Sequence, residues 1–352
     1  MLTLVLVVVL TALVFEYING FHDTANSIAT VVATKVLSPM QAVAMAAGTN
    51  LIGALWGTAV AKTIASGLID AGVVDVGSQL ILCALIGGLC GAALAAAMNN
   101  PEAIIWSQPA DPWYKSAGVL WKVVVPMFSS PVLGFTTGFL LMGLLFAIIS
   151  FMARSGGLLT RLARPRWVNG FFGKAQLASA AYMGFAHGLN DAQKTMGIIA
   201  LALVSAQSVG TLDNLPTWLA FLHPSPEALA EGDIDLWIKL TCALVMAAGT
   251  AAGGWRIIKT LGHKLVKLHP IHGFAAEASA ASVITLASSL GIPVSTTHNI
   301  SSAIMGVGTA KRLNAVKWTV VEKMIWSWIL TIPAAGGIAY LLFKLLQAMG
   351  WV

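Results

Sequence analysis

Apolar runs of about 20 residues recur from one end of this chain to the other. A helix of that length is about 30 Å long, which matches the hydrocarbon layer of a bilayer. Only 10% of the 352 residues are charged and 57% are hydrophobic, whereas a soluble domain has about 25% charged residues. The sequence therefore predicts an integral membrane protein, and the lack of an alternating strand pattern predicts that it is all-α.

Proline and glycine interrupt several of these runs, and proline inside a helix removes a backbone hydrogen bond. Broken or re-entrant helices are therefore expected at these positions: Pro126, Pro131, Gly291, Pro293 and Pro333. The predicted apolar segments are 2–18, 24–37, 40–66, 79–98, 117–153, 176–207, 236–259, 271–290, 299–310 and 316–349. We expect an all-α polytopic membrane protein with about 9 to 11 membrane segments.

Charge is distributed unevenly over the connecting loops. One loop carries Arg154, Arg161, Arg164, Arg166 and Lys174, and another carries Arg256, Lys259, Lys264 and Lys267. Acidic residues gather in a third loop, at Glu227, Glu231, Asp233 and Asp235. Because cytoplasmic loops are enriched in Lys and Arg, the basic loops are expected inside and the acidic loop outside. This placement accounts for the net charge of +6 without a nucleic-acid partner.

The chain also contains an internal repeat. The stretch GFHDTAN at 20–26 aligns with GLNDAQK at 188–194, and WKVVV ahead of SPVLG resembles WTVVE ahead of IPAAG. Transporters often consist of two related halves that meet at a site near the membrane midplane. We divide the chain into an N-terminal membrane repeat (1–153), a basic cytoplasmic linker (154–175) and a C-terminal membrane repeat (176–352). An odd number of crossings in one half would make the repeat inverted.

Asp23 and Asp191 occupy matching places in this repeat. An ionised carboxylate inside a bilayer costs several kcal/mol, so each one needs a partner, water or a function. One interpretation is that each aspartate is a helix N-cap. The other is that a helix broken beside Asp23 offers a carboxylate to a cation and free N–H groups to an anion.

A third polar cluster is GIPVSTTHN at 291–299. Proline breaks the chain there, and hydroxyl groups follow at the start of a new helix, where they could donate hydrogen bonds to a tetrahedral oxyanion. A polar turn with Ser295 as the cap is the alternative. Among single residues, Asn50 and Glu277 could bind a cation, and Glu16 could be structural or part of a proton path. Lys194 matches Asn26 in the repeat and could pair with Asp191 or attract an anion. The three cysteines, Cys83, Cys90 and Cys242, lie in apolar runs and are expected to pack there.

Three motifs, INGFHDTANSIATVVAT, GFAHGLNDAQKTMGIIALAL and GIPVSTTHNISSAIMGVG, together resemble those of the inorganic phosphate transporter (PiT) family, of the bacterial low-affinity permease type. The resemblance implies symport of inorganic phosphate, alone or as a neutral complex with a divalent metal, coupled to protons or sodium. It also implies inverted repeats, a multi-pass protein of the bacterial inner membrane, and neither enzymatic activity nor a cofactor. Phosphate and membrane lipid are the expected partners, with a homodimer as an expected assembly.

The resemblance also carries roles over to individual residues. The substrate-binding residues implied are Asp23, Asn26, Asn190, Asp191, Lys194, Ser295, Thr296, Thr297 and His298. The coupling-ion residues implied are Asn19, Asp23, Asn50, Asp191 and Glu277. No resident metal site is expected.

One departure concerns residues 79–98. The family carries a second Pro-x-Ser-x-Ser/Thr-His signature in its N-terminal half, and this chain has none. The flanks of the missing segment are joined at ALIG, so about one helix with its turn is absent, roughly 25 to 30 residues. We expect impaired transport. The alternatives are a sulfate or other oxyanion permease and a transport-inactive protein kept for regulation or assembly. An intramembrane hydrolase is disfavoured because no HExxH or GxSxG motif occurs.

Overall fold

The computed structural model describes residues 2–66, 68, 105–112, 116–253 and 268–349. Within these ranges the regular structure is helical, apart from one isolated bridge between Gln108 and Ala117, which confirms the expected all-α class. The predicted fused segment 79–98, the basic cluster 256–267 and two of the cysteines lie outside the described residues.

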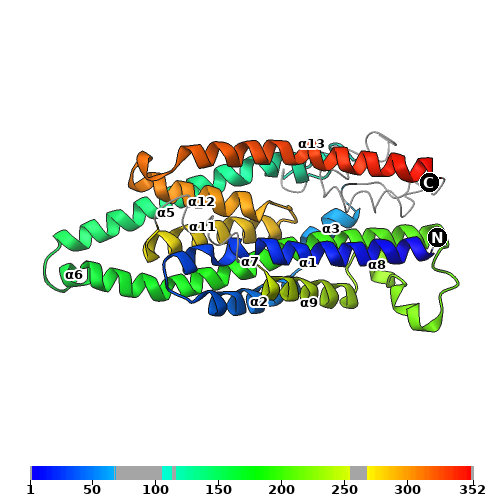
Figure 1. Ribbon diagram of the computed structural model, residues 1–352, viewed down its shortest axis with the longest axis horizontal. Helices are drawn as coiled ribbons and strands as arrows, with labels where there is room; N and C mark the ends of the chain where they lie inside the picture. The colour runs from blue at the N-terminus through cyan, green and yellow to red at the C-terminus, as the bar shows by residue number, and fades with distance from the viewer. Residues whose placement is uncertain (1, 67, 69–104, 113–115, 254–267, 350–352) are drawn as a thin grey trace.

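The helices follow one another in an order that Figure 1 shows by colour. They are α1 (Leu2–Ala33), α2 (Pro39–Trp56), α3 (Ala59–Ser66), the π-helix η3 (Leu120–Val124), α5 (Val125–Arg154), α6 (Gly157–Leu162), α7 (Pro165–Ser208), the 3-10 helix η4 (Thr217–Leu222), α8 (Pro226–Glu231), α9 (Leu236–Ala252), α11 (Pro270–Ser289), α12 (Thr296–Lys311), the 3-10 helix η5 (Leu313–Ala315) and α13 (Trp318–Ala348).

Helices α1 and α7 are continuous through the two repeated aspartates. The prediction of a broken helix beside Asp23 is therefore wrong, and so is the N-cap interpretation of both aspartates. Neither helix has a proline after its first turn, so no backbone hydrogen bond is lost, and the Thr24 hydroxyl bonds back to the Gly20 carbonyl at 2.6 Å. α7 also begins at Pro165, inside the predicted linker.

Proline gives a break at only one of the expected places in the described chain. Pro131 and Pro333 lie inside α5 and α13, which continue through them, because a membrane helix tolerates proline when neighbouring groups satisfy the freed carbonyl. Pro126 directly follows the π-helix η3, and the helical stretch Leu120–Arg154 continues through it without a break. The expected break near Pro293 is confirmed, since α11 ends at Ser289 and α12 begins at Thr296.

One break was not predicted. The segment expected at 40–66 is divided into α2 and α3, which are bent by 59° relative to each other. Gly57 ends α2 in an extended conformation. Gly48 and Gly53 lie inside α2 without breaking it, and glycine inside a membrane helix is common, so Gly57 did not predict the bend.

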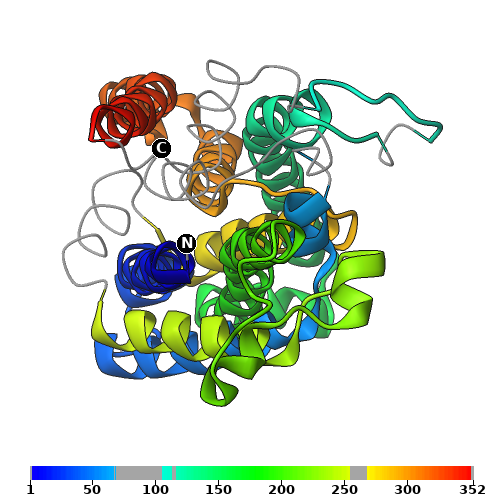
Figure 2. The ribbon, with the colours of Figure 1, turned by 90° about the vertical axis from the view of Figure 1, so that its right-hand side faces the viewer.

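α1 and α7 pack side by side and run in opposite directions (Figure 1). α9 packs on α1 and α2 packs on α7, so each central helix is crossed by the second helix of the other half. α11 packs on α7, and α12 packs on α5. Seen down the long axis (Figure 2), the blue α2 and yellow-green α9 lie below the central helices, whereas α5, α12 and α13 lie above them.

The repeated glycines allow these crossings. A Cβ on Gly20 would meet the backbone of Met246 and Thr250 in α9, and one on Gly188 would meet the backbone of Asn50 in α2. Each glycine lies three residues before the aspartate of its repeat. In the matching GFHD and GLND stretches, the glycine therefore has the same role, which is to admit the backbone of a neighbouring helix. Close contact through small residues is typical of helices in membranes.

Two of the described helical stretches, Leu2–Ala33 and Leu120–Arg154, are long and apolar enough to cross a membrane, and the bent pair α2 and α3 makes a third if it counts as one span. The predicted number of membrane segments stays a prediction. The basic α6 corner lies at one end of the long axis, and α8 in the acidic loop lies at the other (Figure 1).

Candidate functional site

The two repeated aspartates meet at the centre of the bundle on either side of a buried histidine. His187 Nε2 lies 3.2 Å from an Asp191 carboxylate oxygen and 3.8 Å from an Asp23 carboxylate oxygen. One ligand atom from each of the three residues can be chosen so that all lie within 4.8 Å of one another, which is close enough to hold one cation. The Asp191 side chain is 4% exposed and that of Asp23 is 26% exposed, so the two carboxylates differ in their exposure to solvent.

Asn50 fixes the histidine from the far side. Its Oδ1 lies 3.2 Å from His187 Nδ1, and its Nδ2 donates to the Thr250 hydroxyl at 2.9 Å. An Nδ1 that donates to Asn50 leaves Nε2 facing both carboxylates, either as a proton donor or as a lone pair for a cation. Asn50 thus acts on the site through His187 and joins α2, α7 and α9.

The first turn of α12 approaches both carboxylates. The Thr296 hydroxyl donates to Asp191 Oδ2 at 3.1 Å, and the Thr297 hydroxyl donates to Asp23 Oδ1 at 3.5 Å. The Asn26 amide donates to the Thr297 hydroxyl at 2.8 Å, and Ser295 caps α12 by accepting from the His298 N–H at 3.3 Å. Two clusters that are more than 100 residues apart in sequence therefore form one polar centre.

Lys194 and Asn190 hold the link between α11 and α12 against α7. Lys194 Nζ lies 2.7 Å from Asp191 Oδ1 and donates to the Val294 carbonyl at 2.8 Å. Asn190 donates to the Ser288 hydroxyl at 2.8 Å and accepts from the Val294 N–H at 3.4 Å. Both side chains satisfy backbone or hydroxyl groups around the break, so their positions depend on the break at Pro293.

Three residues proposed from the sequence have side chains that make no hydrogen bond to Asp23, Asp191 or His187 within the described chain. The His298 ring packs on Trp328 of α13, with 4.3 Å between ring centroids. Glu277 is buried and accepts hydrogen bonds from Thr30, Ser179 and Gln176 rather than contacting the aspartates. Asn19 lies one turn before Asp23, and within the described ranges its side chain has no hydrogen bond.

Two buried glutamates lie on opposite sides of the aspartate layer. Glu16, two turns before Asp23, accepts from Thr195, which lies one turn after Asp191. Glu277 accepts from Thr30, which lies two turns after Asp23, and from Ser179, which precedes Asp191. This order follows from the opposite directions of α1 and α7, and it gives three layers of buried carboxylates along the bundle.

Sequence reasoning missed His187, which touches both aspartates. The signal was present, because a histidine four residues before Asp191 shares its face of a helix. Gln176, Ser179, Thr195 and Thr250 were also missed, since single hydroxyl and amide groups in apolar runs are common in membrane helices and do not indicate a site.

The arrangement can serve ions of both signs. Carboxylates and His187 Nε2 offer ligands to a cation, whereas the first turn of α12 offers hydroxyl groups and the free N–H groups of a helix N-terminus to an anion. The two kinds of group lie within hydrogen-bonding distance of each other. A cation and an anion could therefore occupy neighbouring positions.

The model of the Phosphate transporter family matches residues 19–86 and 81–339. A "Probable low-affinity inorganic phosphate transporter" of Bacillus subtilis (strain 168) is 35% identical over 375 aligned positions, covering 98% of this chain and 99% of the relative. One of the same description from Mycobacterium bovis (strain ATCC BAA-935 / AF2122/97) is 38% identical, covering 99% of this chain and 79% of the relative.

Among solved structures, one described as "The sodium-dependent phosphate transporter" matches with a TM-score of 0.74 at 21% identity, covering 98% of this chain and 99% of that one. At this identity the likeness concerns the fold alone. The family match and the two relatives extend over nearly the whole chain. The chain therefore belongs to the phosphate transporter family, whose members are membrane transporters rather than enzymes.

Proposed function

We propose that this chain is a secondary active transporter that carries inorganic phosphate across the bacterial inner membrane together with protons or sodium ions. The observation that carries the proposal is the meeting of α12 with both halves of the repeat. Thr296 contacts Asp191 of α7, and Thr297 contacts Asp23 of α1.

Phosphate suits the first turn of α12. Its N–H groups and the hydroxyls of Ser295, Thr296 and Thr297 are donors, and helix N-termini bind phosphate through such groups. The Asn26 amide and the Lys194 ammonium add donors from α1 and α7. His298 is proposed as a packing residue that orients this turn through Trp328, a smaller role than its motif implies.

The carboxylates explain why a cation has to accompany the anion. Two unit charges of the same sign 4 Å apart repel by about 4 kcal/mol near a protein surface. Phosphate beside Asp23 and Asp191 therefore needs a cation between the charges, and His187 completes a ligand set for one. A sodium ion, or the divalent metal of a metal–phosphate complex, would fit this role. Asn50 is proposed to support this cation site by holding His187. Asn19 and Glu277 are proposed to lie in the neighbouring layers that a coupling ion would cross.

The halves 1–153 and 176–352 are proposed to be inverted repeats. The opposite directions of α1 and α7 support this. So does the symmetric packing between the halves, in which α9 packs on α1 and α2 packs on α7. Asn50 of α2 and Thr250 of α9 bond to each other beside the central histidine. The site would then lie on the axis that relates the halves.

Transport is proposed to be weaker than in full-length relatives, because one hairpin is absent near 79–98. Two findings support the absence. The two stretches that match the family model meet at 81–86, and the Bacillus relative aligns over 375 positions, more than the 352 residues of this chain. The greater exposure of Asp23 than of Asp191 fits a site that is less enclosed on the N-terminal side.

Uptake of labelled phosphate into proteoliposomes tests the proposal. An imposed sodium gradient and an imposed proton gradient, applied separately, would identify the coupling ion. The proposal expects uptake that depends on one gradient and is lower than that of the Bacillus relative in the same vesicles. Uptake equal to the relative's would contradict the expected impairment.

Sulfate is the second candidate substrate, because hydroxyl and N–H donors accept either tetrahedral anion. Excess unlabelled sulfate should leave phosphate uptake unchanged if phosphate is the substrate, and should suppress it if the site takes both. A third candidate, a protein that binds phosphate without moving it, would show saturable binding to the purified chain and no uptake above empty vesicles.

A further inference from the structure

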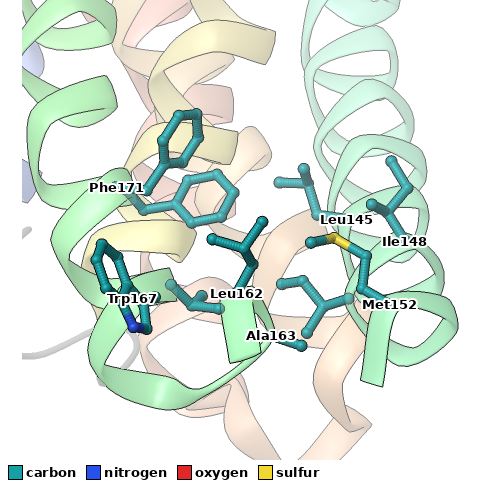
Figure 3. Close-up of a pocket in the computed structure, with 10 residues that line it drawn as sticks. Leu145, Ile148, Met152, Leu162, Ala163, Trp167 and Phe171 are labelled. Atoms are coloured by element: carbon teal, nitrogen blue, oxygen red, sulfur yellow. The ribbon is translucent and has the colours of Figure 1, made fainter. Parts of the chain in front are cut away.

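A cavity of about 410 Å³ lies at the corner where the two halves of the chain are joined. The end of α5, the short helix α6 and the start of α7 enclose it, and every residue that lines it is hydrophobic. Figure 3 shows Leu145 and Met152 of α5 facing Leu162, Trp167 and Phe171 across the open space. The cavity is far from the aspartate centre in sequence and contributes no residue to it.

The corner exposes large hydrophobic side chains around this cavity. Leu158 is 70% exposed, Phe171 67% and Trp167 61%. Helix α6 buries none of its six residues, so within the described chain it has little to pack against. Exposed aromatic rings at the end of a membrane bundle are typical of the interface between hydrocarbon and headgroups.

Basic side chains surround the same corner. Arg154, Arg161, Arg164, Arg166 and Lys174 are all exposed. Residues 151–175 contain no aspartate or glutamate, and within the described part of the chain none of the five cations forms an ion pair. The corner therefore combines an apolar cavity with an uncompensated positive rim.

We propose that this corner binds an anionic phospholipid, with one acyl chain in the cavity and the headgroup phosphate against Arg161 and Arg164. Basic pockets between membrane helices on the cytoplasmic side bind anionic lipid headgroups, and the cytoplasmic surface is rich in them. The acyl chain would give α6 an apolar contact in addition to those that it makes with α5 and α7 in the described chain. The lipid would brace the connection between the halves, and its binding does not depend on transport.

Thermal unfolding of the purified full-length chain tests the proposal. Dioleoylphosphatidylglycerol is expected to raise the melting temperature by at least about 2 °C relative to dioleoylphosphatidylcholine at the same concentration. The double variant R161Q/R164Q should lose this difference. The matched control R312Q/K317Q removes two exposed cations from the connection between α12 and α13, away in sequence from the residues that line the cavity, and should keep the difference.

A second variant tests the acyl-chain site. Ala163 lines the cavity, so Ala163→Trp should fill it and abolish the shift while the rim charges stay in place. Equal shifts with both lipids, a shift that survives in R161Q/R164Q, or loss of the shift in the control pair would each overturn the proposal. Sedimentation tests whether a second copy of the chain, rather than a lipid, occupies this face. A wild-type dimer that Ala163→Trp converts to a monomer would mean that a second copy does.

Discussion

At the scale of single residues, His187 is the side chain on which the candidate site depends most. It is the one described group that faces both repeated aspartates, and Asn50 fixes its ring from behind. Hydrogen bonds to charged groups contribute about 1.5–3 kcal/mol each, so its loss leaves two carboxylates close together without the group between them.

His187→Ala is therefore expected to lower phosphate uptake by about tenfold or more, since 1.4 kcal/mol corresponds to a factor of ten. Uptake in proteoliposomes measures this. His223→Ala is the matched control, because His223 also bonds to a side chain, that of Gln207, but lies exposed in a loop. Equal uptake by the two variants would show that His187 has no role in the site.

Asn50→Ala should have a smaller effect in the same direction, because Asn50 acts on the carboxylates only through the ring. We expect a fall of about 5-fold, in line with a hydrogen bond of about 1 kcal/mol. The variant should also lose the bond to Thr250. A larger loss than that of His187→Ala would mean that Asn50 contacts the transported ion itself.

The sequence was enough to identify the two aspartates and the hydroxyl turn, and it did not identify the histidine between them. A carboxylate in an apolar run stands out because burying it is costly. His187 can be buried as a neutral ring, so it is a weaker signal than a buried carboxylate, and only its place four residues before Asp191 on the same helix face points to the site. Its role becomes visible only when α1 and α7 are placed side by side.

At the scale of elements, continuity of α1 and α7 through the aspartates is the main difference from what the sequence predicted. The sequence predicts helix breaks at polar clusters beside glycine. The glycines instead admit the backbone of a crossing helix, and the polar side chains bond across that crossing. Proline next to a hydroxyl-rich turn was a reliable signal of a break near Pro293, because hydroxyl groups cap a helix that starts there.

Gly188→Ala is expected to destabilise the protein by about 1–3 kcal/mol, because its Cβ would press on the backbone of Asn50. Thermal unfolding in detergent measures the change. Gly173→Ala, in the same helix, meets nothing within 4 Å and should be neutral or stabilising by about 0.5–1 kcal/mol. If both variants unfold at the same temperature, α2 does not pack on α7 at this glycine.

At the scale of the whole molecule, the basic α6 corner and the acidic loop lie at opposite ends of the long axis (Figure 1). Charge bias in the sequence places the first inside the cell and the second outside. This orientation is a prediction from the sequence. How many times the segment near 79–98 crosses the membrane decides whether the N-terminal half can adopt this orientation.

Accessibility of single cysteines to a membrane-impermeant maleimide checks the orientation. In a chain whose own three cysteines are replaced by alanine, Arg164→Cys should react only after the cells are opened, whereas Glu227→Cys should react in intact cells. In intact cells we expect nearly complete labelling of Glu227→Cys and only background labelling of Arg164→Cys. Reaction of both from outside would mean that the halves are not inserted as the charges indicate.

The central claim is that phosphate crosses at the point where the first turn of α12 meets Asp23 and Asp191. Gradient-driven phosphate uptake by the wild type, Asp191→Asn and the control Asp233→Asn, which changes a half-exposed aspartate in the acidic loop, tests it most directly in matched proteoliposomes. We expect uptake by the wild type and by Asp233→Asn, and none above empty vesicles for Asp191→Asn. Uptake by Asp191→Asn equal to that of the wild type would contradict the claim.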